Sequence, residues 1–290
     1  MATTALATSA HAGVIQGSGW SFDSTTGVLE ITGDIQYNDV NGYVSGDNLP
    51  GFSSSQMSSV TSIRFGEGVT YVEGFSYGTG YTYLQSVSFP STLLGINSYA
   101  FDYSSLNSVT FDKDATGMTI NGSAFRGCGH LNVLELPDNT SVFPDAFYGT
   151  NDLKIVLGDM SNASLSSGAF SGVGLVFCPD EACKIKVNSM TAYDTDNIKL
   201  YTKDSDGVYK DEDGVMYASA QDMIAGDTCG THDACVTALG GNSGSGGSGG
   251  NVNNNSGSQS EPKRIYTLEE ARQAVEAAGT ETVNVRIRYK

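Results

Sequence analysis

One dipeptide recurs at steps of 24, 22 and 23 residues through the middle of the chain: Ala100-Phe101, Ala124-Phe125, Ala146-Phe147 and Ala169-Phe170. A leucine-led phrase precedes each dipeptide: Leu84-Gln-Ser-Val-Ser-Phe89, Leu106-Asn-Ser-Val-Thr-Phe111, Leu131-Asn-Val-Leu-Glu-Leu136 and Leu153-Lys-Ile-Val-Leu157. A unit this short cannot bury its own apolar side, so successive units must stack into a solenoid.

Each unit is expected to contain a short strand, a turn and an aromatic ring. The phrase Leu-x-x-apolar-x-apolar, at a period of about 20–29 residues, is typical of leucine-rich repeats. Its apolar positions point inward, while its polar positions line the exposed face of a parallel sheet. The Phe of each dipeptide fills the space between coils. The predicted binding face consists of Gln85, Ser88, Asn107, Thr110, Asn132, Glu135 and Lys154.

A β-hairpin is predicted before the first repeat. Trp20-Ser-Phe22 and Leu29-Glu-Ile31 alternate apolar and polar residues on either side of a Ser-Thr-Thr-Gly turn. The open end of a solenoid exposes apolar surface and free backbone groups, so we expect this hairpin to cover it. Residues 13–58 are assigned to an N-terminal cap and residues 59–180 to the leucine-rich repeats.

The repeat phrases, the Ala-Phe pairs and the opening phrase from Gly19 to Gly33 resemble the BspA-like leucine-rich repeats, a family of bacterial and some protist surface proteins. The resemblance covers roughly residues 17–180. It implies a bacterial protein that is secreted or held at the cell surface, and some members of the family act in adhesion to host matrix or to other cells. It specifies the fold and leaves the ligand open.

The composition favours export and argues against nucleic-acid binding. Apolar residues make up 39% of the 290 residues and charged residues only 16%, as is usual for extracellular β-rich repeats. The net charge of -17 opposes contact with nucleic acid or anionic lipid. No membrane-spanning segment is expected, because no stretch of about 20 apolar residues occurs. Residues 1–12, ending in Ala10-His-Ala12, are interpreted as the remnant of a signal peptide.

Five cysteines fit an oxidising compartment. Cys178 and Cys183 flank four residues, and Cys229 and Cys235 flank five, which favours two local disulfides after the last repeat. Cross-pairing between the two sets is equally consistent with the sequence. Cys128 is then left over inside a repeat, where a free thiol is expected to behave as a small buried apolar group.

Two segments imitate metal-binding motifs. Cys229-x-x-His232-x-x-Cys235 has the spacing of a metal-binding motif but offers only three ligands. We therefore predict a disulfide between the two cysteines and no metal-binding role for the histidine. The acidic run Asp204-x-Asp206-Gly, followed by Asp213, imitates a calcium-binding loop. Its first position is Thr and its last acidic position is Asp instead of Glu, and the flanking Val-Tyr favours a hairpin. We therefore expect no bound metal.

No arrangement of residues indicates catalysis. The sequence has no Gly-x-Ser-x-Gly elbow between a strand and a helix, since its literal match at Gly246–Gly250 lies in the glycine-rich linker. His11 and His130 lie far from any Ser or Cys nucleophile pattern. The glycine-rich stretch is followed by no helix at the spacing that a phosphate-binding loop requires. We expect a protein that is no enzyme and has no cofactor.

The C-terminal part of the chain changes composition. Gly, Ser and Asn dominate a segment that reads as a flexible linker. Thr267-Leu-Glu-Glu270 is a capping box that predicts a helix, and the alternating run from Val283 to Lys290 predicts a strand. Together with Ile265-Tyr266 they form a small β-α-β unit, too small to be stable alone. Residues 181–239 are assigned to a C-terminal cap with the Cys pairs and residues 240–260 to the linker. Residues 261–290 are assigned to the β-α-β unit, which we predict to be a docking module.

The sequence thus predicts a non-enzymatic, exported repeat protein that binds a protein or glycan ligand through the exposed face of its solenoid, with adhesion as its role. The alternative is a structural, self-assembling or anchored surface protein whose function lies in the C-terminal module. In that reading the module docks to an unknown partner, because its basic and amphipathic strand has an open edge.

Overall fold

The computed structural model describes residues 13–33, 35–37, 40–191 and 193–239, together with the strands at 265–266 and 286–287. The chain forms two compact units, Met1–Thr202 and Lys203–Lys290, and their boundary falls inside the segment assigned to a C-terminal cap. The predicted signal-peptide remnant and the linker lie outside the described residues. The described residues contain no helix that is both long and apolar enough to cross a membrane.

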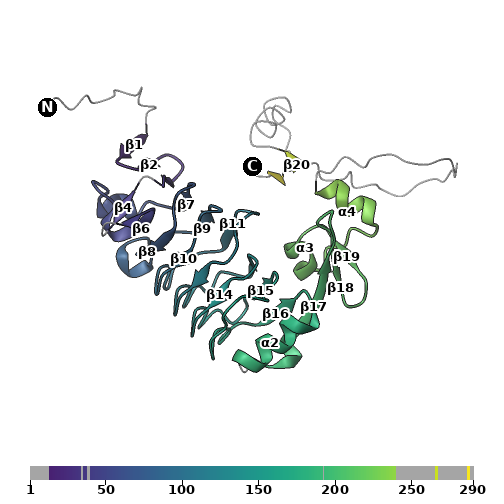
Figure 1. Cartoon of the computed structure of the whole chain (residues 1–290). Coiled ribbons are helices and arrows are strands. Elements are labelled where there is room, and N and C mark those ends of the chain that lie inside the picture. Colours follow the sequence, from purple (N-terminus) through teal and green to yellow (C-terminus); the bar gives the residue numbers. More distant parts are fainter. Residues whose placement is uncertain are drawn as a thin grey trace, which may run out of the picture. The chain divides into compact units, whose positions relative to one another are not determined.

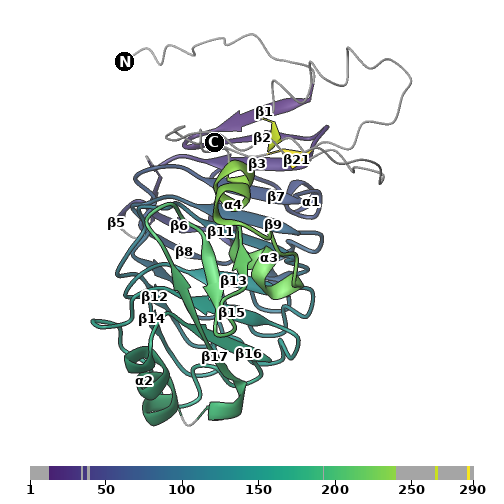
Figure 2. The ribbon, with the colours of Figure 1, turned by 90° about the vertical axis from the view of Figure 1, so that its right-hand side faces the viewer.

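The first unit is a stack of coils whose strands lie side by side (Figures 1 and 2). The first three strands of one sheet are antiparallel, and from the third onward each strand pairs in parallel with the strand of the next coil. Equivalent apolar residues such as Ile63, Val87 and Val109 therefore lie opposite one another. This sheet consists of β1 (Val14–Gly17), β2 (Trp20–Asp23), β3 (Val28–Ile31), β7 (Ser62–Phe65), β9 (Ser86–Phe89) and β11 (Ser108–Phe111), in that order.

A second parallel sheet runs along the coils and connects the later part of each repeat. It has the order β14-β12-β10-β8-β6 and is continuous through the stack. Its strands are β6 (Tyr43–Ser45), β8 (Tyr71–Glu73), β10 (Gly95–Ile96), β12 (Thr119–Ile120) and β14 (Ser141–Val142). The short elements around it are β4 (Gln36–Tyr37), β5 (Val40–Asn41), η1 (Gly46–Asn48), α1 (Ser54–Met57) and η2 (Tyr77–Thr79).

The strands of the last coils belong to a third sheet. Here β13, β15, β16 and β17 pair in parallel in that order. β11 ends the first sheet and β13 begins the third, so the ladder of strands is interrupted between these two coils. We call this interruption the seam. The elements are β13 (Val133–Leu136), β15 (Lys154–Leu157), β16 (Leu175–Cys178), α2 (Glu181–Thr191), η3 (Thr195–Asn197) and β17 (Ile198–Lys203).

The core of the stack is a column of aromatic rings, as the Ala-Phe period predicted. The predicted ring of every Ala-Phe pair is fully buried, with an exposed fraction of 0%. Phe75, Phe101, Phe125 and Phe147 stack one on the next with ring centroids 5.4–5.9 Å apart. A stacked aromatic pair contributes about 0.5–1.5 kcal/mol beyond the area that it buries. These four rings thus bind successive coils to one another.

The N-terminal strands pair as the alternating sequence predicted. Trp20 lies opposite Ile31 in the β2–β3 hairpin, and Trp20 packs edge-on against Phe52. The indole Nε1–H donates a hydrogen bond to the carbonyl of Pro50 at 3.0 Å. This bond satisfies the polar atom of an otherwise buried side chain. The hairpin is continuous with the first repeat, because β3 pairs with β7.

The second unit holds a β-hairpin and two short helices. Tyr209 pairs with Tyr217 across the antiparallel strands of the hairpin. The side chains of Ser219 and Thr231 cap the two helices by accepting backbone N–H bonds. Cys229 and Cys235 are joined by a disulfide. The elements are β18 (Tyr209–Asp211), β19 (Met216–Tyr217), α3 (Ala220–Ala225) and α4 (His232–Ala238).

The other candidate disulfide partners, Cys178 and Cys183, are not joined by a disulfide in the structure. Both thiols are buried, Cys178 at the end of β16 and Cys183 in α2, where they pack as small apolar groups. A hydrogen bond with Cys183, together with burial, raises the pKa of Cys178. Cys128 is likewise a free and buried thiol.

Of the C-terminal module the structure describes two strands. β20 (Ile265–Tyr266) pairs in parallel with β21 (Arg286–Ile287). The helix predicted between them lies outside the described residues, so the β-α-β arrangement stays a prediction.

Candidate functional site

The predicted binding face lies on the strand side of the coils, in two groups. Gln85, Ser88, Asn107 and Thr110 belong to β9, β11 and the residues just before them, on the first sheet. Asn132, Glu135 and Lys154 belong to β13, β15 and the residue before β13, on the third sheet. All seven are exposed or half-buried. The seam separates the two groups, which the sequence did not predict.

Within each group the backbone sets the spacing of these side chains. The Asn107 N–H donates to the Gln85 carbonyl at 2.8 Å, and Ser88 lies opposite Thr110 in the parallel register. On the third sheet the Lys154 N–H donates to the Asn132 carbonyl at 2.9 Å. Each group is therefore a rigid row of small polar or charged groups.

The face changes character along the stack. At the N-terminal end, Glu30 and Arg64 form an exposed ion pair at 3.0 Å. Beyond the seam, Glu135 lies opposite Val156, which in turn lies opposite Phe177. Val156 is fully buried although its strand neighbours Ile155 and Leu157 already point to the core. The predicted alternation of inward and outward residues therefore fails at β15.

Sequence reasoning missed a second surface, at the turns that carry the Ala-Phe pairs. Backbone hydrogen bonds link these turns from coil to coil, for example from Tyr103 N–H to the Arg126 carbonyl at 2.7 Å and from Gly127 N–H to the Tyr148 carbonyl at 2.8 Å. Four tyrosines in these turns expose 53–59% of their surface. We call this surface the tyrosine edge: Tyr77, Tyr99, Tyr103 and Tyr148, with Arg126 among them.

Arg126 is fixed beside two tyrosines of this edge, Tyr99 and Tyr103. Its Nε and Nη2 each donate to one carboxylate oxygen of Asp102 at 2.8 Å, and this bidentate pair is half-buried. The guanidinium lies 5.2 Å from the ring centroids of both Tyr99 and Tyr103. A cation over an aromatic face contributes about 0.5–1 kcal/mol at exposed sites. The two rings are thereby held in place without being buried.

Both of these tyrosines occupy backbone conformations that disfavour large side chains. Tyr99 has φ +61° and Tyr103 has φ +52°. At the position of Tyr103, two residues after the buried Phe, the next three repeats have Gly127, Gly149 and Gly172, all with positive φ. A bulky residue in this region costs of order 1–3 kcal/mol and is found most often at functional positions. Tyrosine at a glycine position of the repeat is the sequence signal that identifies this edge.

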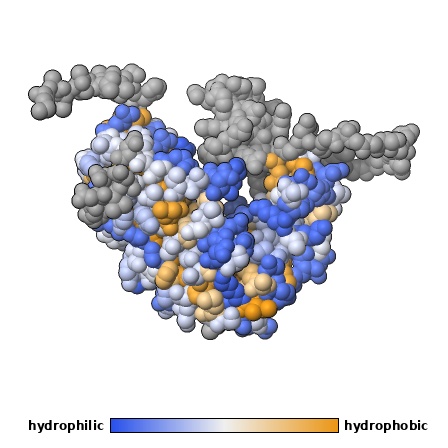
Figure 3. Space-filling model, viewed as in Figure 1, coloured by the Kyte–Doolittle hydropathy of each residue, from blue (hydrophilic) through white to orange (hydrophobic). Residues whose placement is uncertain are grey.

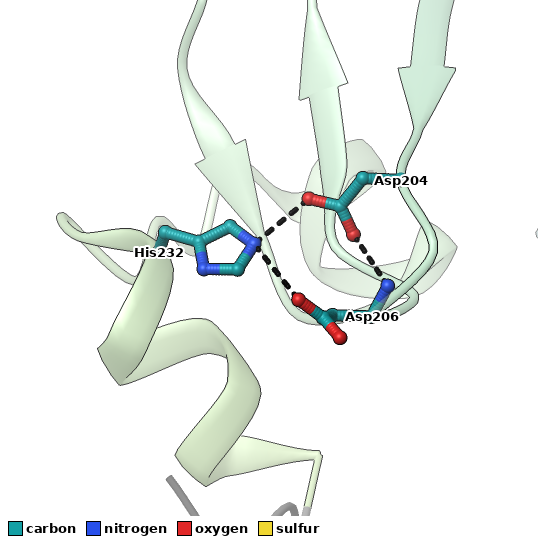
Figure 4. Close-up of side chains that lie close together, drawn as sticks. All are labelled: Asp204, Asp206 and His232. Atoms are coloured by element: carbon teal, nitrogen blue, oxygen red, sulfur yellow. Dashed lines mark hydrogen bonds and ion pairs between the residues drawn. The ribbon is translucent and has the colours of Figure 1, made fainter. Parts of the chain in front are cut away.

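The second unit contains a polar cluster, drawn in Figure 4. His232 Nε2 lies 2.9 Å from Asp204 Oδ2 and 3.7 Å from Asp206 Oδ2. Asp204 and Asp206 lie in the turn before β18, and His232 is the first residue of α4. The structure thus brings together the two segments that imitate metal-binding motifs in the sequence. All three side chains are accessible to solvent.

The turn that contains Asp204 and Asp206 is followed in the sequence by a nearly identical turn. The two turns are Asp204-Ser-Asp206-Gly and Asp211-Glu-Asp213-Gly. In the first, Asp204 Oδ1 accepts the N–H groups of Asp206 and Val208, both at 3.0 Å. In the second, Asp211 Oδ1 accepts the equivalent N–H groups at 3.1 and 2.9 Å. The turns differ in the other oxygen: Asp204 Oδ2 faces His232, whereas Asp211 Oδ2 accepts from the Tyr217 hydroxyl at 2.7 Å.

The buried thiol of Cys128 is not an activated nucleophile. Burial raises the pKa of Cys128 to about 11, so the protonated thiol dominates at neutral pH. Its sulfur lies 3.3 Å from the Ser104 hydroxyl and 3.2 Å from the Phe101 carbonyl, and both of these contacts join neighbouring coils. Cys128 is therefore a packing residue.

The exposed hydrophobic residues form no single large patch in the view of Figure 3, where orange areas alternate with hydrophilic ones. Scattered apolar side chains are normal on a protein surface. The tyrosine edge is defined by its tyrosines and its arginine.

Residues 51–176 match the BspA type leucine rich repeat region in six copies. Over this range the repeats are similar to the BspA-type leucine-rich repeats. Among solved structures, the chain is similar to a leucine rich cell surface protein from Faecalibacterium prausnitzii A2-165, with 19% identity and a TM-score of 0.39. The similarity covers 63% of this chain and 43% of that one, so this chain spans less than half of its length. No curated protein matches the chain.

Proposed function

We propose that this chain is an exported binding protein of the cell surface, without enzymatic activity, that recognises a protein partner through its solenoid. The tyrosine edge is the observation that carries this proposal. Tyr and Arg are enriched among the residues that dominate binding energies at protein interfaces. Here two exposed tyrosines, Tyr99 and Tyr103, lie beside Arg126, which is itself held by its ion pair with Asp102.

The physical advantage of such an edge is that it is organised before the partner arrives. A tyrosine supplies a large contact area while losing few rotamers on binding. Tyr99 and Tyr103 lie beside a guanidinium that Asp102 already holds, so little side-chain order remains to be gained. Adjacent Ser, Gly and Asn residues of the turns provide adaptable hydrogen bonding, as they do in antibody combining sites.

The sheet face has a supporting role in this proposal. Its Gln, Ser, Asn and Thr side chains are small and lack the aromatic anchors of a strong interface. Rows of polar groups at fixed spacing provide complementarity, and they favour weak contacts that become strong when many copies bind together. Adhesion between a cell and a surface uses this kind of contact.

Export is supported by the composition and by the repeat class. The chain is rich in Gly, Ser, Thr and Asn and poor in charge, and one pair of its cysteines is joined by a disulfide. Disulfides persist in oxidising compartments outside the cytoplasm. Together with the BspA-type repeats, these features support a function outside the cell.

The test compares purified full-length protein with variants on each surface. Immobilised extracellular-matrix proteins, a glycan array and intact bacterial cells serve as probes. Tyr99→Ser and Tyr103→Ser are expected to weaken binding at least tenfold, whereas Tyr83→Ser, which removes an equally exposed tyrosine outside the edge, leaves it unchanged. Equal binding by all variants overturns the tyrosine edge as the site. Binding to glycans alone overturns the choice of a protein partner.

The alternative function, docking through residues 261–290, is favoured by the parallel pairing of β20 with β21. Two short strands leave an edge at which another chain can add a strand. Deleting residues 261–290 separates the two functions. If the truncated protein keeps its place on the cell and loses no binding, the module is dispensable for both.

A further inference from the structure

We propose that Asp204, Asp206 and His232 form a binding site for a divalent transition-metal cation, with zinc as the preferred ion. The three residues each offer one ligand atom, and these atoms all lie within 4.8 Å of one another. A tetrahedral zinc ion bound at about 2.0–2.2 Å by nitrogen and carboxylate oxygen requires ligand atoms within this range of one another. The separations of 2.9 and 3.7 Å between His232 Nε2 and the two carboxylates lie on either side of the roughly 3.3–3.6 Å that such a tetrahedron gives between ligand atoms.

The mixed set of donor atoms selects the class of cation. Imidazole nitrogen suits zinc, copper and nickel, whereas calcium and magnesium prefer sites made of oxygen alone. Two carboxylates and one imidazole match the ligand types of zinc sites that keep an open position for water. The site is therefore expected to hold a zinc ion with one further ligand from solvent.

The duplicated turn shows that the carboxylate geometry is independent of the histidine. The turn of Asp211 and Asp213 has the same backbone hydrogen bonds as the turn of Asp204 and Asp206. In the second turn none of these bonds involves a histidine. In the second turn the free oxygen of the first Asp is used by a tyrosine hydroxyl. In the first turn the same oxygen and the neighbouring carboxylate both point to one imidazole nitrogen (Figure 4). Only the first turn thus has a metal-ligating set.

The histidine is held in position by its own segment. His232 opens α4, and the Thr231 hydroxyl caps this helix by accepting the Ala234 N–H at 3.3 Å. The disulfide between Cys229 and Cys235 closes the segment on both sides of the histidine. The imidazole is therefore presented to the turn without a metal, which lowers the ordering cost of binding.

The charge of the surroundings favours a cation. Residues 203–239 contain eight acidic and two basic residues, a formal charge of -6.

Isothermal titration of metal-free protein, without a histidine tag, with Zn²⁺ tests the proposal. Wild type is expected to bind one Zn²⁺ per chain, and EDTA is expected to reverse the binding. His232→Ala and Asp206→Asn should each weaken binding at least tenfold. Asp213→Asn, the equivalent change in the duplicated turn, is the matched control and should leave affinity within twofold. Asp204 is left intact because its Oδ1 also holds the turn.

Replacement of Zn²⁺ by Co²⁺ gives a second readout that does not depend on affinity alone. A tetrahedral site with nitrogen and oxygen ligands should produce visible d–d absorption that disappears in His232→Ala. Circular dichroism checks that this variant keeps its fold. The absence of Zn²⁺ binding in wild type, or equal losses in Asp206→Asn and Asp213→Asn, overturns the proposal. Binding of Ca²⁺ without Zn²⁺ also overturns it.

Discussion

The rings of Phe101 and Phe125 lie face to face, with centroids 5.4 Å apart and planes inclined by 9°. Both residues are fully buried and belong to neighbouring coils. Phe125 stacks in the same way on Phe147 at 5.7 Å. The ring of Phe125 therefore contacts both the coil before it and the coil after it, so its removal weakens two contacts between coils.

Phe125→Ala is expected to destabilise the protein by about 3–5 kcal/mol, as is usual when a fully buried aromatic side chain is truncated. Chemical denaturation followed by circular dichroism measures the loss. Phe143→Ala is the matched control, because Phe143 is a ring in the next repeat with 39% of its surface exposed. The control should cost less than about 1 kcal/mol. Equal losses in the two variants would show that the ring column is not the main support of the stack.

Tyr103→Gly is expected to leave the free energy of unfolding unchanged or to raise it slightly. The left-handed backbone at this position favours Gly, and this gain offsets the lost contact with Arg126. Gly127→Ala should instead destabilise by about 1–2 kcal/mol, because φ is +69° there. Its new Cβ would also lie 2.5 Å from the Tyr103 ring. Thermal unfolding of the two variants compares these effects directly, and a stabilised Gly127→Ala protein contradicts the assignment.

Asp102 and Arg126 should be energetically coupled by about 1 kcal/mol, since the pair is bidentate and only partly exposed. A double-mutant cycle with Asp102→Asn and Arg126→Gln measures this coupling. Arg126→Lys should lose most of it, because an ammonium group cannot donate in the same paired geometry. A coupling energy near zero means that the ion pair only orients the tyrosines.

The number of cysteines that react should increase in steps, as the protein is first unfolded and then reduced. At pH 8 iodoacetamide is expected to leave the native protein unmodified, because the thiolate is the reactive form and the pKa of Cys128 is raised to about 11 by burial. Reactivity of native Cys128 should rise only as the pH approaches that value. Unfolding without a reductant should expose three thiols to alkylation, and reduction should expose all five. A single adduct after unfolding means that Cys178 and Cys183 are joined.

The repeats could be predicted because their signals are local and periodic. Leu84, Leu106 and Leu131 have the burial that the leucine-led phrase assigns to them, and the Phe residues form the expected column. Periodicity specifies which residues face inward. It does not specify register from coil to coil, so the seam between β11 and β13 and the buried Val156 could not be anticipated.

The helices after the last repeat were missed for a different reason. α2 has no clear apolar stripe, and its start is marked only by Asp180, whose carboxylate accepts the Cys183 N–H at 2.8 Å. α3 has readable signals in Ser219, which caps it, and Gly226, which ends it in a left-handed conformation. The cluster of Asp204 with His232 joins residues 28 positions apart, a proximity that only the fold supplies.

At the seam the strand side of the solenoid should resist bending least. Where strands pair in a continuous ladder, a change of curvature stretches backbone hydrogen bonds, but between β11 and β13 the ladder offers none. At the turn edge the same two coils stay joined by the Asp102–Arg126 pair and by the bond from Tyr103 N–H to the Arg126 carbonyl. The second sheet also continues across this point, because β10, β12 and β14 pair in order. Tension from an attached partner would therefore separate these two coils on the strand side first, while the tyrosine edge holds them together.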